Sequence, residues 1–374
     1  MSRSGLRPWE STAAGGARVT QRAVAEAVGV NQATVSYVLS GRRSGGRISE
    51  AVIRRIRATA ERLGYVANQP AQALASGRTQ TVGVLIEGWT RNRYAIVWNM
   101  LAEGLETRLL SAGYEVRLRR VEGRPFHNAS LMLRQRLADA VVYIGQRAEA
   151  ADAVPTPGRP PLVFIDWGAG MPRPRVTQDP VPGMRAAAAH LLGLGHRRVL
   201  WVAPASAARS PSRNRLESLR TALAEGGGGI DVLPLALGDA WHHGAADGAI
   251  ARAREALAGR LPARPAFTAI ACWNDLLAFA AAGVLEERGL CVPRDISLVG
   301  FDDIGAAWGR PPLTTVSGAF HGMGEAAAGI VLDMLRGKLS AADALKTARD
   351  VPTGLVVRRS TGPARDLKKR RLAP

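Results

Sequence analysis

The stretch VTQRAVAEAVGVNQATVSYVLSG, residues 19–41, sets the architecture of the N-terminal part of the chain. Thr20 is placed to cap a short helix, because a hydroxyl at this position accepts from the N–H groups of the first turn. Gly29 ends that helix, since a tight turn needs a residue that tolerates positive φ. A second helix is expected from about Gln32 to Leu39, so the spacing predicts a helix-turn-helix pair.

The two faces of this second helix differ in character. Val35, Val38 and Leu39 recur at helical spacing and are expected to pack inward, which leaves the polar residues and Tyr37 mostly outward. After the basic loop RRSGGR, Ser49 is placed to cap a third helix that Gly64 closes. Its apolar stripe consists of Val52, Ile53, Ile56, Ala60 and Leu63. Three helices of this kind form a helix-turn-helix domain.

Charge is distributed unevenly along the 374 residues. The formal net charge is +19, and residues 1–80 hold 12 Arg against 4 Glu. Residues 358–374 hold 7 basic residues and 1 acidic residue, which include the run KKRR at 368–371. A surface of this sign attracts polyanions such as nucleic acid. The run KKRR is either a source of non-specific DNA affinity or a solvated tail end.

Cysteine usage and hydropathy indicate the compartment. The two cysteines, Cys272 and Cys291, are too few for a disulfide framework and show no metal-ligand spacing, so neither a metal nor a cofactor is expected. The N-terminus lacks the apolar core of a signal peptide, and no run approaches the ~18 apolar residues of a membrane span. We therefore expect a cytoplasmic protein without membrane association.

The expected organisation has five parts. Residues 1–17 read as a disordered tail, 18–64 as the helix-turn-helix domain, 65–80 as a hinge, and 363–374 as a basic tail. Between them, residues 81–362 alternate strand and helix patterns, as in TVGVLIEG, ADAVVYIG, RRVLWVAP and DISLVGFDD. This alternation predicts an α/β body with parallel sheets, and its length favours two sheets over one. Ligands of such sheets bind beyond the carboxyl ends of the strands.

An ordered set of motifs resembles the lac repressor and galactose repressor (LacI/GalR) family of bacterial transcription regulators. Besides residues 19–41, the motifs are ISEAVIRRIRATAERLGYVAN at 48–68, LASGRTQTVGVL at 74–85, HLLGLGHRRVLWV at 190–202, CWNDLLAFAAAGVLEERGLCVPRDISLVGFDDI at 272–304 and PPLTTV at 311–316. The resemblance implies a helix-turn-helix head, a hinge helix, and a two-lobed body like a periplasmic binding protein. It also implies a homodimer on double-stranded operator DNA, controlled by a small-molecule effector such as a sugar, a sugar derivative or another metabolite.

The resemblance assigns DNA contacts to the head and hinge. Gln32, Ala33 and Tyr37 fall on the base-reading positions, and Thr20, Asn31, Thr34 and Ser36 are candidates for the remaining contacts, mainly to phosphates. Gln32 suits an adenine through N6 and N7, and family members commonly place arginine where Tyr37 stands. In the hinge, Asn68 would cap a helical segment from which Leu74, flanked by Ala71 and Ala75, would wedge between base pairs.

In the body, the resemblance assigns effector contacts to Arg215, Asn274, Asp302, Asp179 and the aromatic Phe320. Simpler structural roles compete: Asn274 or Asp275 could be the N-cap of the following helix, and Asp303 could cap the next turn. His190 and His196 are expected to be structural, and Phe301 and Trp308 to be packing residues. The loop at residues 88–98 departs from the family, and its Trp89, Arg91, Arg93, Tyr94 and Trp98 predict an aromatic, cationic rim for an anionic or aromatic effector.

Other functional classes remain as alternatives. The chain could act as an activator or a regulator that depends on a co-repressor. A plain solute-binding protein of the same body fold is disfavoured by the DNA-binding head. An enzyme is disfavoured because GVLIEGWTRNR lacks the spacing of a phosphate-cradling glycine loop and no nucleophile, base and orienting acid line up in any motif. We therefore expect no catalytic residues.

Overall fold

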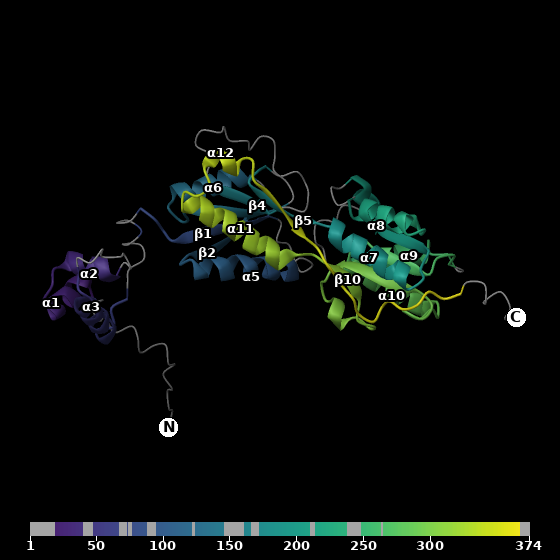
Figure 1. The fold of residues 1–374 in the computed structure, drawn as a ribbon, viewed down its shortest axis with the longest axis horizontal. Coiled ribbons are helices and arrows are strands. Elements are labelled where there is room, and N and C mark those ends of the chain that lie inside the picture. Colours follow the sequence, from purple (N-terminus) through teal and green to yellow (C-terminus); the bar gives the residue numbers. More distant parts are fainter. Residues whose placement is uncertain are drawn as a thin grey trace, which may run out of the picture. The chain divides into compact units, whose positions relative to one another are not determined.

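The structure is a computed structural model of the chain, and it describes a defined set of residues. These are residues 19–39, 48–66, 73, 77–87, 95–121, 124–145, 161–165, 172–209, 214–237, 248–262 and 265–366. The chain divides into two compact units, Met1–Thr79 and Gln80–Pro374. Each unit is described by itself (Figure 1).

Within residues 19–66, the first unit contains three helices, α1 (Gln21–Val28), α2 (Gln32–Leu39) and α3 (Glu50–Arg62). The predicted caps are present: the Thr20 hydroxyl accepts from the Ala23 N–H at 3.2 Å, and the Ser49 hydroxyl accepts from the Val52 N–H at 3.4 Å. Gly29 adopts a φ of 72°, which glycine tolerates without strain. A small core holds the three helices together and consists of Val24, Ala25, Val28, Val35, Val38, Ile56 and Ala60.

The second unit begins with a lobe built on a parallel sheet of order β11-β5-β4-β3-β1-β2. Its strands are β1 (Thr81–Glu87), β2 (Glu115–Val121), β3 (Ala140–Ile144), β4 (Leu162–Ile165), β5 (Arg175–Asp179) and β11 (Ala348–Pro352), and its helices are α5 (Ala95–Ser111), α6 (Pro125–Arg134), α11 (Phe320–Leu335) and the short α12 (Ala341–Ala344). The apolar side chains of α5 and α11 share one core with the strands, and those of α6 share a second.

The second lobe has a sheet of order β12-β10-β9-β8-β6-β7, in which β12 pairs antiparallel with β10 and the other neighbours pair in parallel. Its strands are β6 (Arg198–Pro204), β7 (Gly229–Leu235), β8 (Ala269–Cys272), β9 (Ser297–Asp302), β10 (Thr314–Ser317) and β12 (Leu355–Val356). Helices α7 (Val181–Gly193) and α8 (Asn214–Glu225) pack together, as do α9 (Ala249–Ala258) and α10 (Asp275–Glu287). The described part of this lobe also contains the 3₁₀ segments η3 (Ala205–Arg209) and η6 (Ala306–Trp308).

The chain passes between the two lobes three times, from β5 to α7, from β10 to α11 and from β11 to β12. Thr353, between β11 and β12, ties two of these passages together. Its hydroxyl donates to the Asp179 carbonyl at 2.9 Å and accepts from the Gly183 N–H at 3.2 Å. The prediction of two parallel sheets is therefore confirmed, and the ends of β5, β9 and β10 lie where the lobes are joined.

Candidate DNA-binding and effector sites

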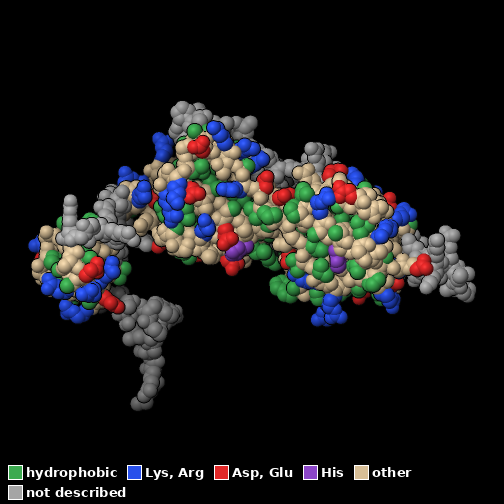
Figure 2. All heavy atoms as spheres, in the orientation of Figure 1, with side chains coloured by type: hydrophobic (Ala, Val, Ile, Leu, Met, Phe, Trp, Pro, Cys, Tyr) green, Lys and Arg blue, Asp and Glu red, His purple; other side chains and the backbone are tan. Residues whose placement is uncertain are grey.

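The outward face of α2 is the candidate DNA-reading surface of the head. Asn31, Gln32 and Ala33 are exposed and Tyr37 is half-buried, whereas Val35 and Val38 are buried in the core of the head. The buried pair fixes the rotation of the helix, because it belongs to the same apolar cluster as α3. Basic side chains also lie on the head surface (Figure 2).

The N-terminus of α2 is closed by an internal hydrogen-bond pair. The Asn31 side-chain oxygen accepts from both the backbone N–H and the hydroxyl of Thr34, each at 2.7 Å. Because the Thr34 hydroxyl donates its only proton to Asn31, it can offer an approaching group acceptor capacity alone. Thr20 is the opposite case, since its hydroxyl accepts from Ala23 and keeps its own proton for donation. Of these two hydroxyls, Thr20 is the one suited to a phosphate.

Eight site residues proposed from the sequence lie outside the described residues. They are Asn68, Ala71, Leu74 and Ala75 of the hinge, and Trp89, Arg91, Arg93 and Tyr94 of the rim. Trp98, which was expected to join that rim, is 8% exposed and belongs to the core of the first lobe. This expectation was wrong because the helical spacing of α5 turns Trp98 inward together with Leu101 and Leu105.

A buried arginine forms the centre of the candidate effector site. Arg215, in the first turn of α8, is 4% exposed, and its Nη1 donates to the Trp273 carbonyl at 2.7 Å. Its Nη2 lies 3.6 Å from Asp302 Oδ1. The guanidinium carbon also lies 3.7 Å from the ring centre of Phe301 and 5.0 Å from that of Trp273. Aromatic faces and a carboxylate thus hold this cation out of bulk water.

Gln178, at the end of β5 in the first lobe, reaches the same arginine from the other side. With its amide oriented to satisfy both neighbours, Gln178 accepts from Arg215 Nη2 at 2.8 Å and donates to the Gly318 carbonyl at 3.0 Å. Asp302 and Gln178 therefore meet at Arg215, although they belong to different lobes. The sequence reasoning missed Gln178, and the signal that could have found it was its position at the carboxyl end of a strand.

Two further carboxylates lie beside Asp302 and are satisfied internally. Asp303 pairs with the Arg358 guanidinium at 2.8 Å, so the expectation that it caps the next turn is replaced by an ion pair. Asp275, 1% exposed, accepts from the Thr315 hydroxyl at 2.6 Å and from the Ile304 N–H at 2.7 Å. Burial, followed by the neighbouring charge of Asp302, raises the pKa of Asp275 well above its ordinary value. The second lobe therefore gathers three carboxyl groups, and Asp302 is the one that faces the buried guanidinium of Arg215.

The remaining predicted effector residues have structural contacts of their own. Asn274 is the N-cap of α10, where its side-chain oxygen accepts from the Leu277 N–H at 3.1 Å. Asp179 Oδ1 accepts from the Val181 N–H at 3.0 Å at the start of α7. Phe320 is 3% exposed, begins α11 and belongs to the core of the first lobe. Of the predicted effector residues, Asp302 lies beside Arg215. Arg215 also donates to the carbonyl of Trp273, the residue that precedes Asn274.

Several side chains with possible chemistry are structural in the second lobe. His190 Nε2 lies 2.8 Å from the Thr361 hydroxyl, and the ring of His196 contacts the Thr268 hydroxyl at 2.8 Å and the Gly362 carbonyl at 3.0 Å. Burial lowers the pKa of both histidines, so both favour the neutral ring. Cys272 is buried, which raises its pKa and holds it as an unreactive thiol.

Trp308 contradicts the expectation that it packs inside the body. It ends η6 with 80% of its surface exposed, whereas Phe301 is fully buried as expected. Gly305 and Gly309 flank the 3₁₀ turn, and the side chain of Trp308 points from this turn into solvent.

The described residues were compared with the requirements of a metal site and of a membrane-spanning helix. Across the described ranges, His, Cys, Asp and Glu nowhere gather in the groups of three that could hold a metal ion. Within the same ranges, every helix falls short of the length and apolarity that a bilayer crossing requires.

The fold and the two sites define a helix-turn-helix head joined to a periplasmic-binding-protein-like body. Residues 20–68 match the profile of bacterial regulatory proteins of the lacI family, and residues 188–361 match that of the periplasmic binding protein-like domain. The chain therefore combines a lacI-family helix-turn-helix domain with a periplasmic binding protein-like domain, as its motifs predicted.

Relatives of known function match nearly the whole chain. The HTH-type transcriptional repressor PurR of Photobacterium profundum is 29% identical over 325 residues, which cover 85% of this chain and 92% of that protein. The ribose operon repressor of Escherichia coli (strain K12) is 28% identical over 322 residues, with coverages of 84% and 92%.

Solved structures give the same architecture. The lac repressor dimer bound to operator and the anti-inducer ONPF superposes with a TM-score of 0.68 at 23% identity, covering 92% of this chain and 99% of that one. The complex of the transcriptional regulator CelR with cellobiose superposes with a TM-score of 0.58 at 25% identity, covering 92% and 100%.

Proposed function

We propose that the chain is a transcriptional repressor that binds a two-fold operator as a homodimer and responds to a small-molecule effector held by its body. The observation that carries this proposal is the combination of an exposed, capped α2 with a separately cored body whose lobes meet at Arg215. Its relatives are named as repressors, and the lac repressor structure contains operator DNA. No step of this function requires a catalytic residue or a cofactor, and we place its action in the cytoplasm, where the DNA lies.

The head supports sequence reading through α2. Gln32 and Ala33 are fully outward at the N-terminal end of the helix, which is the end that contacts base edges in helix-turn-helix proteins. The Gln32 amide can pair with an adenine, whereas Ala33 offers only apolar contact, for example to a thymine methyl. We propose Thr20, Asn31, Thr34 and Ser36 as supporting contacts, with Thr20 the strongest phosphate donor among them.

Selection of bound sequences from random DNA tests this part of the proposal. Enrichment of a two-fold site is expected, and failure to enrich any such site would contradict the proposal. Tyr37→Arg should then shift the preferred base toward guanine, because arginine forms a bidentate contact with O6 and N7 that tyrosine lacks. Identical selected sites for both proteins would assign Tyr37 to packing instead.

The affinity for the selected site should fall steeply with salt. Arg22, Arg54 and Arg78 are exposed on the described part of the first unit. Each arginine that neutralises a phosphate steepens the slope of log K against log salt by about 0.9. A mobility-shift titration between about 50 and 200 mM salt measures this slope, and Arg22→Gln should reduce it by about one phosphate contact. A flat slope would contradict DNA binding through this surface.

The Arg215–Asp302 cluster supports effector binding in the body. A guanidinium beside a carboxylate can donate to and accept from hydroxyl groups at the same time, and the guanidinium alone can pair with a carboxylate. We propose Arg215, Asp302 and Gln178 as the polar contacts, with Asn274, Asp179 and Phe320 around them. Calorimetry with sugars, sugar acids and aromatic acids, followed by operator titration with each hit, tests the assignment. Arg215→Gln should weaken any hit that depends on this cluster.

Dimerisation has a direct test as well. Sedimentation at micromolar concentration should give a dimer, because a two-fold site needs two heads. A monomer that nevertheless binds a two-fold site tightly would contradict this part of the proposal.

A further inference from the structure

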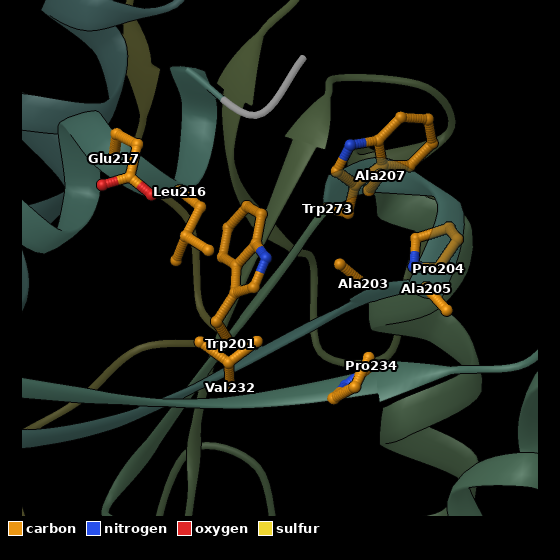
Figure 3. A pocket seen from close by; sticks show the side chains of 10 residues that line it. All are labelled: Trp201, Ala203, Pro204, Ala205, Ala207, Leu216, Glu217, Val232, Pro234 and Trp273. Carbon is orange, nitrogen blue, oxygen red and sulfur yellow. The ribbon is translucent and has the colours of Figure 1, made fainter. Parts of the chain in front are cut away.

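A pocket of about 160 Å³ lies in the second lobe between strands β6 and β7 and the first turn of α8 (Figure 3). The indole of Trp201 rises from β6 beside Leu216, and Trp273 lies on the other side of the pocket (Figure 3). Val232, on the edge strand β7, lines the pocket and is 43% exposed, so the pocket lies at the open edge of the sheet. A ligand therefore has a route to it from solvent.

The lining of this pocket is almost entirely apolar. Among the described residues, the lining consists of two tryptophan rings, one leucine, one valine, and alanine and proline side chains, and Glu217 supplies the single carboxylate. Glu217 is exposed and pairs with Arg220 at 2.8 Å, so its charge faces solvent. Apolar cavities of about 150 Å³ in proteins stay dry and take up benzene. The volume and the lining thus fit one six-membered ring.

The pocket is separate from the polar cluster but shares a wall with it. Trp273 lines the pocket, while its carbonyl accepts from Arg215 and its ring lies 5.0 Å from the guanidinium carbon. Leu216 lines the pocket and directly follows Arg215 on α8. A group that enters the pocket and displaces Trp273 or Leu216 must therefore disturb the contacts of Arg215.

We propose that the Trp201–Trp273 pocket binds an uncharged ring of about the size of benzene, and that such a ring forms part of the effector of this regulator. The second half of this inference rests on the proposed function. The charges on the two sides favour an uncharged ring. Glu217 at the rim is paired with Arg220, so it supplies no free charge to hold an ionic ring. The guanidinium of Arg215 already lies beside the Trp273 ring, which disfavours a second cation there.

Ligand-observed ¹⁹F NMR of fluorobenzene with the full-length protein tests the pocket. Broadening of the fluorobenzene signal is expected, with benzoate and tetramethylammonium binding at least tenfold more weakly. Val232→Trp should weaken fluorobenzene binding at least tenfold, because the larger side chain fills the pocket from its exposed rim. Ala205→Phe, at a second exposed lining position, should act in the same way. The matched control is Val357→Trp, at a residue that is 55% exposed on the same lobe and lies outside the pocket lining.

Each outcome bears on one part of the inference. Three results would each overturn the inference. The first is the absence of fluorobenzene binding, and the second is equal binding by the wild type and both filling variants. The third is tighter binding of benzoate or tetramethylammonium than of fluorobenzene. Operator affinity is measured in parallel, with and without saturating fluorobenzene. A change in operator affinity supports the link to the effector, and an unchanged affinity refutes that link. Operator binding without fluorobenzene binding rejects the pocket alone, whereas fluorobenzene binding without operator binding rejects the proposed function alone.

Discussion

Replacement of Arg215 by methionine should destabilise the body by about 3 kcal/mol. Methionine keeps an unbranched stem against Phe301 and Trp273 but removes every polar contact of the guanidinium. Truncating one partner of a buried ion pair costs roughly 3–5 kcal/mol, because the other charge stays buried without compensation. Here the separation of 3.6 Å between Nη2 and Asp302 Oδ1 exceeds a hydrogen bond, and the Asp302 side chain is 14% exposed. Both facts place the cost at the lower end of that range.

Urea unfolding followed by tryptophan fluorescence measures this loss. Residues 19–66 contain no tryptophan, so among the described residues the signal comes from the body. Asp302→Asn in the Arg215→Met background should recover about 1–2 kcal/mol, since the carboxylate charge that lost its contact with Arg215 is then absent, and the double-mutant cycle isolates the coupling. A loss below about 1 kcal/mol for Arg215→Met, or no recovery in the double variant, would refute the view that Arg215 neutralises Asp302.

Three further perturbations test the head and the buried carboxylate. Thr20→Val removes the hydroxyl that caps α1 and should cost the head about 1 kcal/mol in a thermal melt, with Thr20→Ser as the control that restores the cap. Ile56→Ala empties the fully buried centre of the head core and should cost roughly 2–5 kcal/mol, enough to abolish operator binding while the tryptophan-monitored unfolding of the body stays unchanged. Burial and Asp302 raise the pKa of Asp275, so its contribution to stability is complete below the unfolded pKa of about 3.9 and is lost as the pH rises through the folded pKa. Asp275→Asn should therefore flatten the decline of the urea midpoint with rising pH, and an equally steep decline in the variant would assign the slope to another group.

The head could be predicted from the sequence because its signals are local. Caps at Thr20 and Ser49, a positive-φ glycine at position 29 and inward residues at helical spacing each act within a few residues. The structure places α1, α2 and α3 within one or two residues of the predicted ranges.

The elements that were missed depend on tertiary contacts. Strand β7 reads GIDVLPL, and its glycine, aspartate and proline argue against a strand, yet these residues are tolerated because β7 is an edge strand. Helix α11 contains three glycines, which lowers its intrinsic helix propensity. Glycine is needed there because α11 packs closely against α5. A Cβ at Gly104 of α5 or at Gly324 of α11 would overlap the backbone of the opposite helix. A close crossing of two helices distant in sequence cannot be read from either one.

The candidate effector cluster was predicted only in part. Arg215 and Asp302 were named from motifs, but their contact depends on three chain passages that bring the ends of β5, β9 and β10 together. Backbone strain gathers at the same place. Asp302 and Asp303 follow one another at φ values of 104° and 60°, and Ala319 adopts 53° just after β10. Non-glycine residues hold such values only where their surroundings compensate for the cost of ~1–3 kcal/mol each. Arg215 and Arg358 supply that compensation by pairing with the two carboxylates. A ligand that competes for Arg215 would release part of this restraint at the junction of the lobes, which is where a small binding event can change their relative position.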